Sequence, residues 1–466
     1  MTSHPSPPAP LPWYWALLQR AVKVRPEEAR VLGVSFVALF CIFTGYASLR
    51  PVRDSLGVTL GSRQLGGLFG WTFAGMLAAM PIFGWLASRF PRRVFLPAVY
   101  GFFILNLLGF YALLTHAPSL ALGARLFFVW VSVVNLFIVS AFWSLMADLH
   151  TSEQSRRLFG FIAAGSSAGS IVGPALTALL VKKLGHADLL LLAAGFWTVA
   201  VGLIVALLRR SGPGRQPPDR APLAGPAPAP EERPLGGNPL SGISLVGRSP
   251  YLLGISLFIL LLSATTTFLY LQQAAHLARE IALPADRTRL LAALDTAVNI
   301  LSLLLQLLLV GRLTVRLGVA LVLFSVPALM VVGFVVLALA PALGVLVAVM
   351  IVRRVGEYGL LRPSREVLFT SVDRQAKYKA KSFIDTVVYR GADWLNAKLH
   401  DLLVAAGLST SGVALGGAVV AALWAGVGYT IGRWHTAGRG IIKQPRPADA
   451  DNLLRGQDHA GQLRDS

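Results

Sequence analysis

The sequence has few charged residues and a single cysteine. Asp, Glu, Lys and Arg make up only 14% of the 466 residues, whereas hydrophobic residues make up 55% and the mean hydropathy is +0.63. A typical soluble domain has roughly 25% charged residues, so the composition excludes that class and favours a membrane protein with many spans. Cys41 has no second cysteine to pair with, which excludes an intrachain disulfide.

The sequence also lacks the motifs of enzymes and of ATP-driven pumps. No glycine-rich loop is followed by Lys-Ser or Lys-Thr, no side chains show metal-ligand spacing, and the eight histidines are scattered. The sequence therefore predicts no enzyme, no metal and no cofactor. Gly165 and Gly169 stand among other small residues, a pattern that predicts close helix packing rather than phosphate binding.

About twelve apolar runs are long enough to cross the hydrocarbon core, which takes about 20 residues. Each run is continuously apolar instead of alternating, so we expect membrane-spanning helices and not barrel strands. The predicted fold is an all-α membrane protein of about 12 transmembrane helices. The runs lie near residues 32–49, 65–87, 94–114, 119–147, 158–181, 187–208, 251–273, 290–310, 318–340, 342–361, 382–405 and 411–432.

The basic residues, 42 Lys and Arg against 22 Asp and Glu, follow the ends of these runs. Most of them fall in alternate loops and in both terminal segments, which is the pattern that places such segments in the cytoplasm. They form no patch that is independent of the membrane edges, which argues against a nucleic-acid partner. We expect a multi-pass monomer in the lipid bilayer of the cell inner (plasma) membrane, with both termini cytoplasmic.

A Pro- and Gly-rich segment divides the runs into six and six. Such a composition cannot pack a core and predicts a flexible cytoplasmic linker. Because each half begins and ends on the same side, the two halves are predicted to be parallel repeats. The expected segments are an N-terminal cytoplasmic segment with an interfacial helix at 1–30, a six-helix half at 31–210, the linker at 211–249, a second half at 250–434, and a cytoplasmic tail at 435–466.

A short phrase occurs once in each half. Gly84-Trp-Leu-Ala-Ser-Arg89 follows the second run, and Gly311-Arg-Leu-Thr-Val-Arg316 follows the eighth, so Gly, Leu and Arg recur at matching offsets. The first copy resembles the loop signature of the major facilitator superfamily, although Ser88 replaces its usual acid. The resemblance implies alternating access by two rocking halves, with the first, fourth, seventh and tenth spans lining the central pathway.

A narrower resemblance covers about half of the chain. Leu49-Arg-Pro-Val-Arg53-Asp-Ser-Leu56 and the segment from Pro363 to Arg390 resemble phrases of the ATP:ADP antiporter family of nucleotide transporters, or its bacterial relatives. In that family, Arg53 would be Lys and Arg362 would often be Asp. The resemblance implies nucleotide exchange.

Charged residues inside the apolar runs are costly to bury and mark candidate sites. Arg50, Arg53 and Asp54 close the first run, and the spacing of Arg50 and Asp54 predicts a pair on one helix face. Arg125 lies near the start of the fourth run. Arg53 and Arg125 are predicted substrate contacts, and the alternative is that these arginines reach the outer interface.

The tenth and eighth runs carry the other candidate contacts. Arg353 and Glu357 can pair at i, i+4, which would leave Arg354 free to bind a carboxylate or phosphate. Asp295 and Asn299 begin a polar stripe on the eighth run, and this stripe is either a wall of the cavity or a seam between helices. Because arginine dominates these runs, the predicted substrate is a small organic anion.

A further set of charges is predicted to close the inner rim, with topology anchoring as the alternative. Asp385 lies one turn after Lys381 and could form a salt bridge there. The set consists of Arg89, Arg92, Arg93, Arg316, Glu366, Lys379, Lys381, Asp385 and Arg390.

These patterns predict a secondary transporter, and they leave its substrate open. Exchange of nucleotides, proton-coupled symport and efflux of another small molecule are all compatible with them. In the proton-coupled alternative, Glu357, Asp295 or Asp385 would carry the proton. A membrane scaffold or receptor that does not transport is the alternative of another class.

Overall fold

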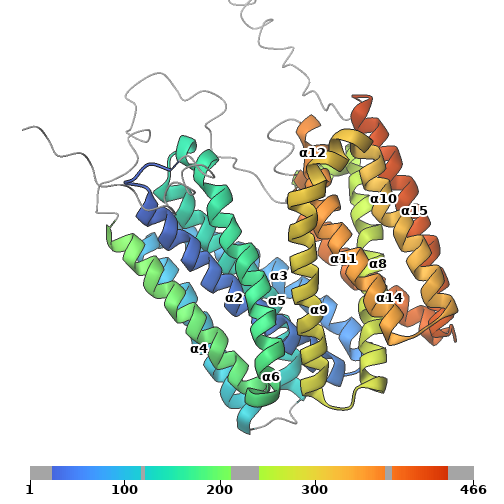
Figure 1. The fold of residues 1–466 in the computed structure, drawn as a ribbon, viewed down its shortest axis with the longest axis horizontal. Helices are drawn as coiled ribbons and strands as arrows, with labels where there is room; N and C mark the ends of the chain where they lie inside the picture. The colour runs from blue at the N-terminus through green and yellow to red at the C-terminus, as the bar shows by residue number, and fades with distance from the viewer. Residues whose placement is uncertain (1–23, 117–120, 211–240, 373–379, 382, 439–466) are drawn as a thin grey trace, which may run out of the picture.

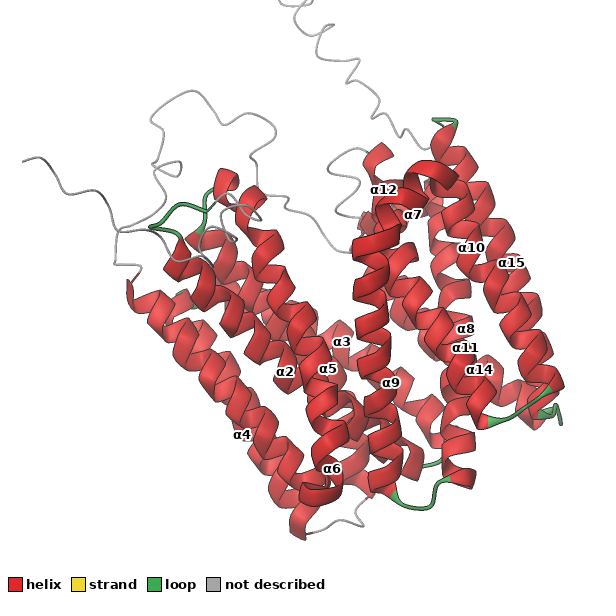
Figure 2. Cartoon of the chain, in the orientation of Figure 1, coloured by secondary structure: helices red, strands yellow, loops and turns green. Residues whose placement is uncertain are grey.

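The computed structural model describes residues 24–116, 121–210, 241–372, 380–381 and 383–438, and every secondary-structure element in this part of the chain is helical (Figures 1 and 2). The predicted interfacial helix before residue 24, most of the linker and the tail beyond residue 438 lie outside the described residues. The division of the chain into five segments stays a prediction.

Six spans form the first half. Their helices are α2 (Ala29–Thr59), α3 (Ser62–Arg89), α4 (Arg92–His116), α5 (Ala121–Leu149) and α6 (Ser152–Arg210). Helix α6 contains the fifth and sixth spans, because Gly185 interrupts it with a φ of 78° that favours glycine.

The second half starts with the short helix α7 (Ser241–Arg248), which occupies the end of the segment expected to be a flexible linker. Val246 of α7 is buried in the core of this half, so the chain is packed from there on. The following elements are α8 (Pro250–Glu280), α9 (Pro284–Leu305), η2 (Gln306–Val310), α10 (Gly311–Leu339), α11 (Leu343–Gly356), η3 (Glu357–Leu361), α12 (Arg362–Leu368), η4 (Phe369–Ser371), η5 (Ile384–Val388), α14 (Tyr389–Ala405) and α15 (Thr410–Thr436).

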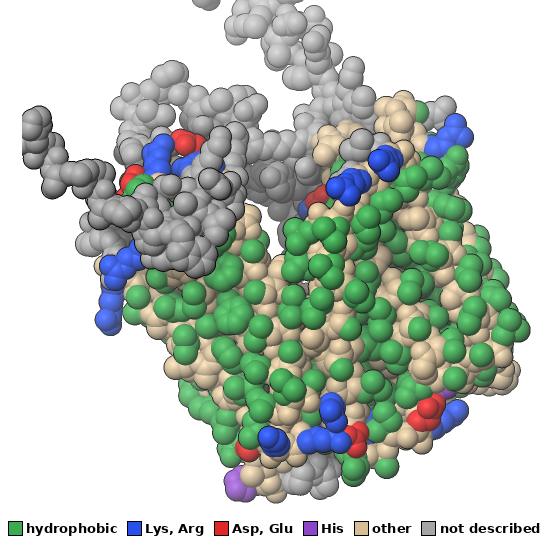
Figure 3. All heavy atoms as spheres, in the orientation of Figure 1, with side chains coloured by type: hydrophobic (Ala, Val, Ile, Leu, Met, Phe, Trp, Pro, Cys, Tyr) green, Lys and Arg blue, Asp and Glu red, His purple; other side chains and the backbone are tan. Residues whose placement is uncertain are grey.

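The expected apolar runs and the observed helices coincide. Nine helices of the described chain are long and apolar enough to cross a membrane. Counting the two spans of α6, and the shorter α11 and α14 with η3 and η5, gives twelve crossing segments. Large apolar side chains such as Trp71, Leu179 and Leu339 are exposed, and Figure 3 shows a hydrophobic band with charged side chains at its two edges. An apolar band bounded by charged side chains is typical of a surface that faces lipid.

Each half has its own core, and the halves meet at one end. One cluster of buried side chains runs from Val24 to Leu208 and another from Val246 to Ile431. A third, smaller cluster joins the halves through residues such as Leu65 and Phe128 on one side and Leu271 and Leu291 on the other. In Figure 1 the bundles converge at the lower end, where α9 contacts α2 and α6, and separate at the upper end.

The close packing of α2 on α6 follows from three glycines. A Cβ atom built on Gly165, Gly169 or Gly173 would lie 2.5 Å from a backbone oxygen of α2. The small-residue face predicted around Gly165 and Gly169 is therefore a helix-packing surface, as expected.

Candidate substrate cavity

A cavity of about 950 Å³ lies between the two halves, and Figure 3 shows the cleft between them at the upper edge of the molecule. Side chains from both halves line it. The charged ones are Arg50, Arg53, Asp54, Asp295, Arg353, Arg354, Glu357, Arg362, Arg365, Glu366, Asp385, Arg390 and Asp393. The aromatic ones are Phe43, Tyr46, Phe69, Phe128, Tyr270, Tyr358 and Tyr389.

Irregular helix geometry places part of this lining. Pro51 has no N–H, so the carbonyl of Ala47 in the cavity wall loses its usual partner one turn along α2. In the second half, π-helical turns interrupt the spans at η2, η3 and η5, and Gln306, Glu357 and Asp385 are among the lining residues on these turns. Such turns are frequent at functional sites because they redirect side chains.

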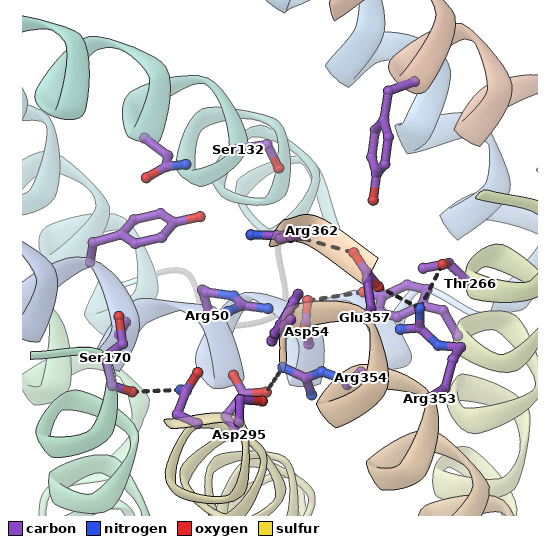
Figure 4. A pocket seen from close by; sticks show the side chains of 18 of the residues that line it. Arg50, Asp54, Ser132, Ser170, Thr266, Asp295, Arg353, Arg354, Glu357 and Arg362 are labelled. Carbon is purple, nitrogen blue, oxygen red and sulfur yellow. Dashed lines mark hydrogen bonds and ion pairs between the residues drawn. The ribbon is translucent and has the colours of Figure 1, made fainter. Parts of the chain in front are cut away.

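The two arginines of the tenth span are both paired. Arg353 donates to Glu357 at 2.7 Å, as the i, i+4 spacing predicts, and to Thr266 of α8 at 2.8 Å. Arg354 was expected to be uncompensated, and this expectation is wrong. Its guanidinium lies 2.6 Å from Asp295 of α9, so a carboxylate from another helix neutralises it (Figure 4).

At the end of the first span, the pairing differs from the predicted one. Asp54 accepts hydrogen bonds from Arg53 at 2.9 and 2.7 Å and from Tyr270 of α8 at 2.9 Å. Arg53 also donates to Ser132 and lies 5.0 Å from the centre of the Phe128 ring. The predicted Arg50–Asp54 pair is absent, because Asp54 is already engaged by its neighbour and by the other half.

Arg50 lines the cavity, although the sequence interpretation paired it with Asp54 and did not count it among the substrate contacts. Its half-buried side chain extends from α2 toward the other half (Figure 4). Among the described residues, no hydrogen bond or ion pair involves it, whereas each of the other six arginines that line the cavity lies within 4.0 Å of a carboxylate. The i, i+4 spacing predicted that Arg50 would be neutralised by Asp54, and for this reason Arg50 was not expected to bind the substrate.

The polar stripe of the eighth span has both of the expected roles. Asp295, Asn299, Ser302 and Gln306 all line the cavity. Asn299 also donates to the carbonyl of Ser170 at 2.7 Å and so connects the two halves.

The predicted rim residues fall into two groups. Glu366, Asp385 and Arg390 line the cavity. The expected Lys381–Asp385 bridge is replaced by two others: Lys381 pairs with Glu366 at 2.6 Å, and Asp385 pairs with Arg365 at 3.1 Å.

The other described rim residues are not among those that line the cavity. Arg89, Arg93 and Arg316 are exposed near the ends of helices. Lys379 and the side chain of Arg92 lie outside the described residues.

Arg125 does not lie in the cavity. It is exposed near the start of α5 and donates to Gln64 of α3 at 2.7 Å. The structure therefore does not bring this predicted substrate contact together with Arg53, Arg353 and Arg354.

Polar contacts close the end of the cavity where the halves converge. Lys182 of α6 pairs with Asp286 of α9 at 2.6 Å. A nitrogen of His186 lies 2.7 Å from the hydroxyl of Thr288, and Ser55 donates to the carbonyl of Pro284 at 3.1 Å.

In the described part of the chain, twelve helical spans in two bundles surround a charged central cavity, and this arrangement is typical of α-helical membrane transporters. The sequence profile of the Major Facilitator Superfamily matches residues 15–374, and the chain belongs to this family. No curated protein matches the sequence.

Solved structures of transporters share the fold. A bacterial homologue of the human lysosomal transporter Spinster, in an inward-facing and unoccupied conformation, is 16% identical with a TM-score of 0.57, and the match covers 91% of this chain and all of that one. The nucleoside transporter NupG is 12% identical with a TM-score of 0.60, over 88% of this chain and 100% of the other. A POT family transporter in complex with 5-aminolevulinic acid is 13% identical with a TM-score of 0.61, and the match covers 87% of this chain and 97% of that one. At these identities the likeness concerns the fold alone.

Proposed function

We propose that this chain is a secondary transporter of a small organic anion and that Arg50 is its primary anion-binding group. One observation carries the proposal: no carboxylate of the described residues lies within 4.0 Å of Arg50, whereas each of the other cavity arginines has one. The carboxylate that acts most strongly on Arg50 is Asp295, which is already paired with Arg354. An arginine stays protonated at any physiological pH, so the positive charge of Arg50 attracts an anion into the cavity. A carboxylate or phosphate would accept two parallel hydrogen bonds from its planar fork.

The rest of the lining supports an organic rather than an inorganic anion. A volume of about 950 Å³ is in the range of sites for small organic molecules. Tyr46, Phe43 and Phe69 offer apolar ring surface in the same cavity, and hydroxyls such as Ser166 and Ser170 offer hydrogen bonds.

Movement of the two halves would carry the anion across the membrane. The contacts of Lys182, His186 and Ser55 with α9 would break while the opposite end closes. The positive-inside pattern favours a cytoplasmic position for the open end, both termini and the exposed Arg89, Arg93 and Arg316, in the plasma membrane. These three arginines are candidates for the contacts that close that end.

Nucleotide exchange is a narrower version of this proposal. It rests on the resemblance around Arg53 to the ATP:ADP antiporter family. Arg53, however, already binds Asp54 at 2.7 Å, so a nucleotide phosphate would have to compete with a carboxylate there and would bind first at Arg50.

A thermal-shift screen of the purified protein against ATP, glucose 6-phosphate and succinate tests the proposal. We expect at least one of these anions to stabilise the wild type, and Arg50→Gln to abolish that stabilisation while Arg125→Gln, outside the cavity, keeps it. Uptake of the stabilising anion into proteoliposomes then distinguishes a transporter from a membrane receptor. Uptake that needs the same anion inside indicates exchange, whereas uptake that needs a proton gradient indicates symport. Equal stabilisation of the wild type and of Arg50→Gln would refute the assignment of Arg50.

A further inference from the structure

Asp393 on α14 is the least neutralised carboxylate that lines the cavity. The other lining carboxylates of the described chain lie 2.6 to 3.1 Å from a basic group. The closest basic nitrogen to Asp393 belongs to Arg390, at 3.4 Å, a distance at which a hydrogen bond is weak. Asp393 is nevertheless buried, with 8% of its surface exposed. A buried carboxylate with weak compensation is costly to keep charged.

The surroundings of Asp393 offer little other charge. On α8, the neutral hydroxyl of Ser263 donates to one carboxylate oxygen at 2.7 Å and in turn accepts from Asn396 at 3.3 Å. From η3, Glu357 adds negative charge. On the side of α3, Phe73 lies opposite Gly391 and Gly70 lies against Trp394. On α14 itself, the phenol of Tyr389 lies one turn before Asp393 and is the other titratable neighbour.

We propose that Asp393 is a proton-binding site that couples proton movement to anion transport. This rests on the proposed function, since the proton is carried together with the anion. The carboxylate takes up one proton and becomes a neutral acid, and the proton is released again when the opposite side opens. Glu357, Asp295 and Asp385, which the sequence offered as carriers, each lie closer to an arginine than Asp393 does.

Protonation would change what the cavity can bind. Once Asp393 is neutral, Arg390 loses its ionic partner, and its guanidinium, which lines the same cavity as Arg50, becomes a second free cation. Binding of the anion and of the proton would then favour each other, which thermodynamic linkage requires to be reciprocal. This is the coupling that a symporter needs.

Infrared difference spectroscopy of the purified protein, titrated from alkaline to acid pH without any anion substrate, tests the proposal. The expected signal is a protonated-carboxyl C=O band that shifts in D2O, is lost in Asp393→Asn and is kept in Asp385→Asn, the matched control from the same span. Asp393→Glu should restore a band at a shifted frequency, which also shows that the site tolerates substitution.

The outcomes separate this proposal from the previous one. Arg50→Gln should keep the band even though it loses anion binding, because proton binding at Asp393 does not need the anion. No titrating carboxyl band in the wild type, or a band that persists in a folded Asp393→Asn variant, would overturn the assignment. If the band were lost in Asp385→Asn and kept in Asp393→Asn, the proton would bind to Asp385, and the assignment to Asp393 would also be overturned.

Discussion

Asp54 forms its ion pair with Arg53, its neighbour in the chain, at 2.7 Å. Arg50, one turn earlier on the same helix, lies within 4.0 Å of no carboxylate among the described residues. Tyr270 of α8 donates to the same carboxylate oxygen at 2.9 Å. The contact with the other half therefore helps to hold Asp54 away from Arg50. In this way the packing of the two halves determines which arginine is available to an anion.

Removal of Asp295 should destabilise the protein and increase its response to anions. Asp295→Asn leaves the buried guanidinium of Arg354 without its partner at 2.6 Å, and breaking a buried pair costs about 3 kcal/mol. We expect a lower melting temperature in the absence of anions, and a larger stabilisation than in the wild type by the anion that the thermal-shift screen identifies, because two arginines without a close carboxylate then face the cavity. A melting temperature equal to that of the wild type would contradict the pairing.

The ion pair of Lys182 and Asp286 should hold the converging end shut. We expect Lys182→Glu to open this end by repulsion from Asp286, and the exchange Lys182→Glu with Asp286→Lys to close it again. Labelling of Ser167→Cys, a cavity residue, by an impermeant maleimide in a Cys41→Ala background measures the opening. If Lys182→Glu left the labelling from the converging end unchanged, the ion pair would not be what keeps that end closed.

Gly169 should be indispensable for the packing of α2 on α6. A side chain at this position would lie 2.5 Å from the carbonyl oxygen of Phe40, and backbone cannot give way as a flexible side chain can. We expect Gly169→Val to abolish the monodisperse peak in size-exclusion chromatography. Gly160→Val on the same helix meets nothing within 4 Å and should leave the peak unchanged, so loss of the peak in both variants would refute a packing role specific to Gly169.

Glu28, just before α2, should contribute stability that depends on pH. Burial alone would raise its pKa, but hydrogen bonds from the backbone of Arg25 and from the side chains of Arg157 and Gln154 hold the pKa below its ordinary value. A lowered carboxylate pKa means that the contribution is present above the ordinary glutamate pKa and is lost as the pH falls through the lower, folded-state value.

Thermal melts at neutral and acid pH measure this contribution. At neutral pH, Glu28→Gln should melt below the wild type, and the difference should narrow at acid pH. Glu27→Gln, at the exposed neighbouring position, should have the melting temperature of the wild type at both pH values. A difference for Glu28→Gln that does not narrow at acid pH would contradict the linkage.

The fold was predictable from the sequence, whereas most partners in the cavity were not. Continuous apolar runs determine spanning helices almost by length alone, because a bilayer leaves the backbone few alternatives. Within a helix, the spacing of Arg353 and Glu357 was enough to predict their bond. Arg354 and Asp295 lie on different spans, however, and nothing in the spacing brings them together. For Arg50 the same spacing rule was misleading, since it ignores the competing contact from Tyr270.

The binding of anions to purified wild type and Arg50→Gln, with Arg125→Gln as the control, tests the central claim most directly. A hydrogen bond to a charged group contributes about 1.5 to 3 kcal/mol, so isothermal titration with the stabilising anion should show a loss of about tenfold to a hundredfold in affinity for Arg50→Gln. The control should bind as the wild type does. Unchanged affinity in a folded Arg50→Gln variant would contradict the account.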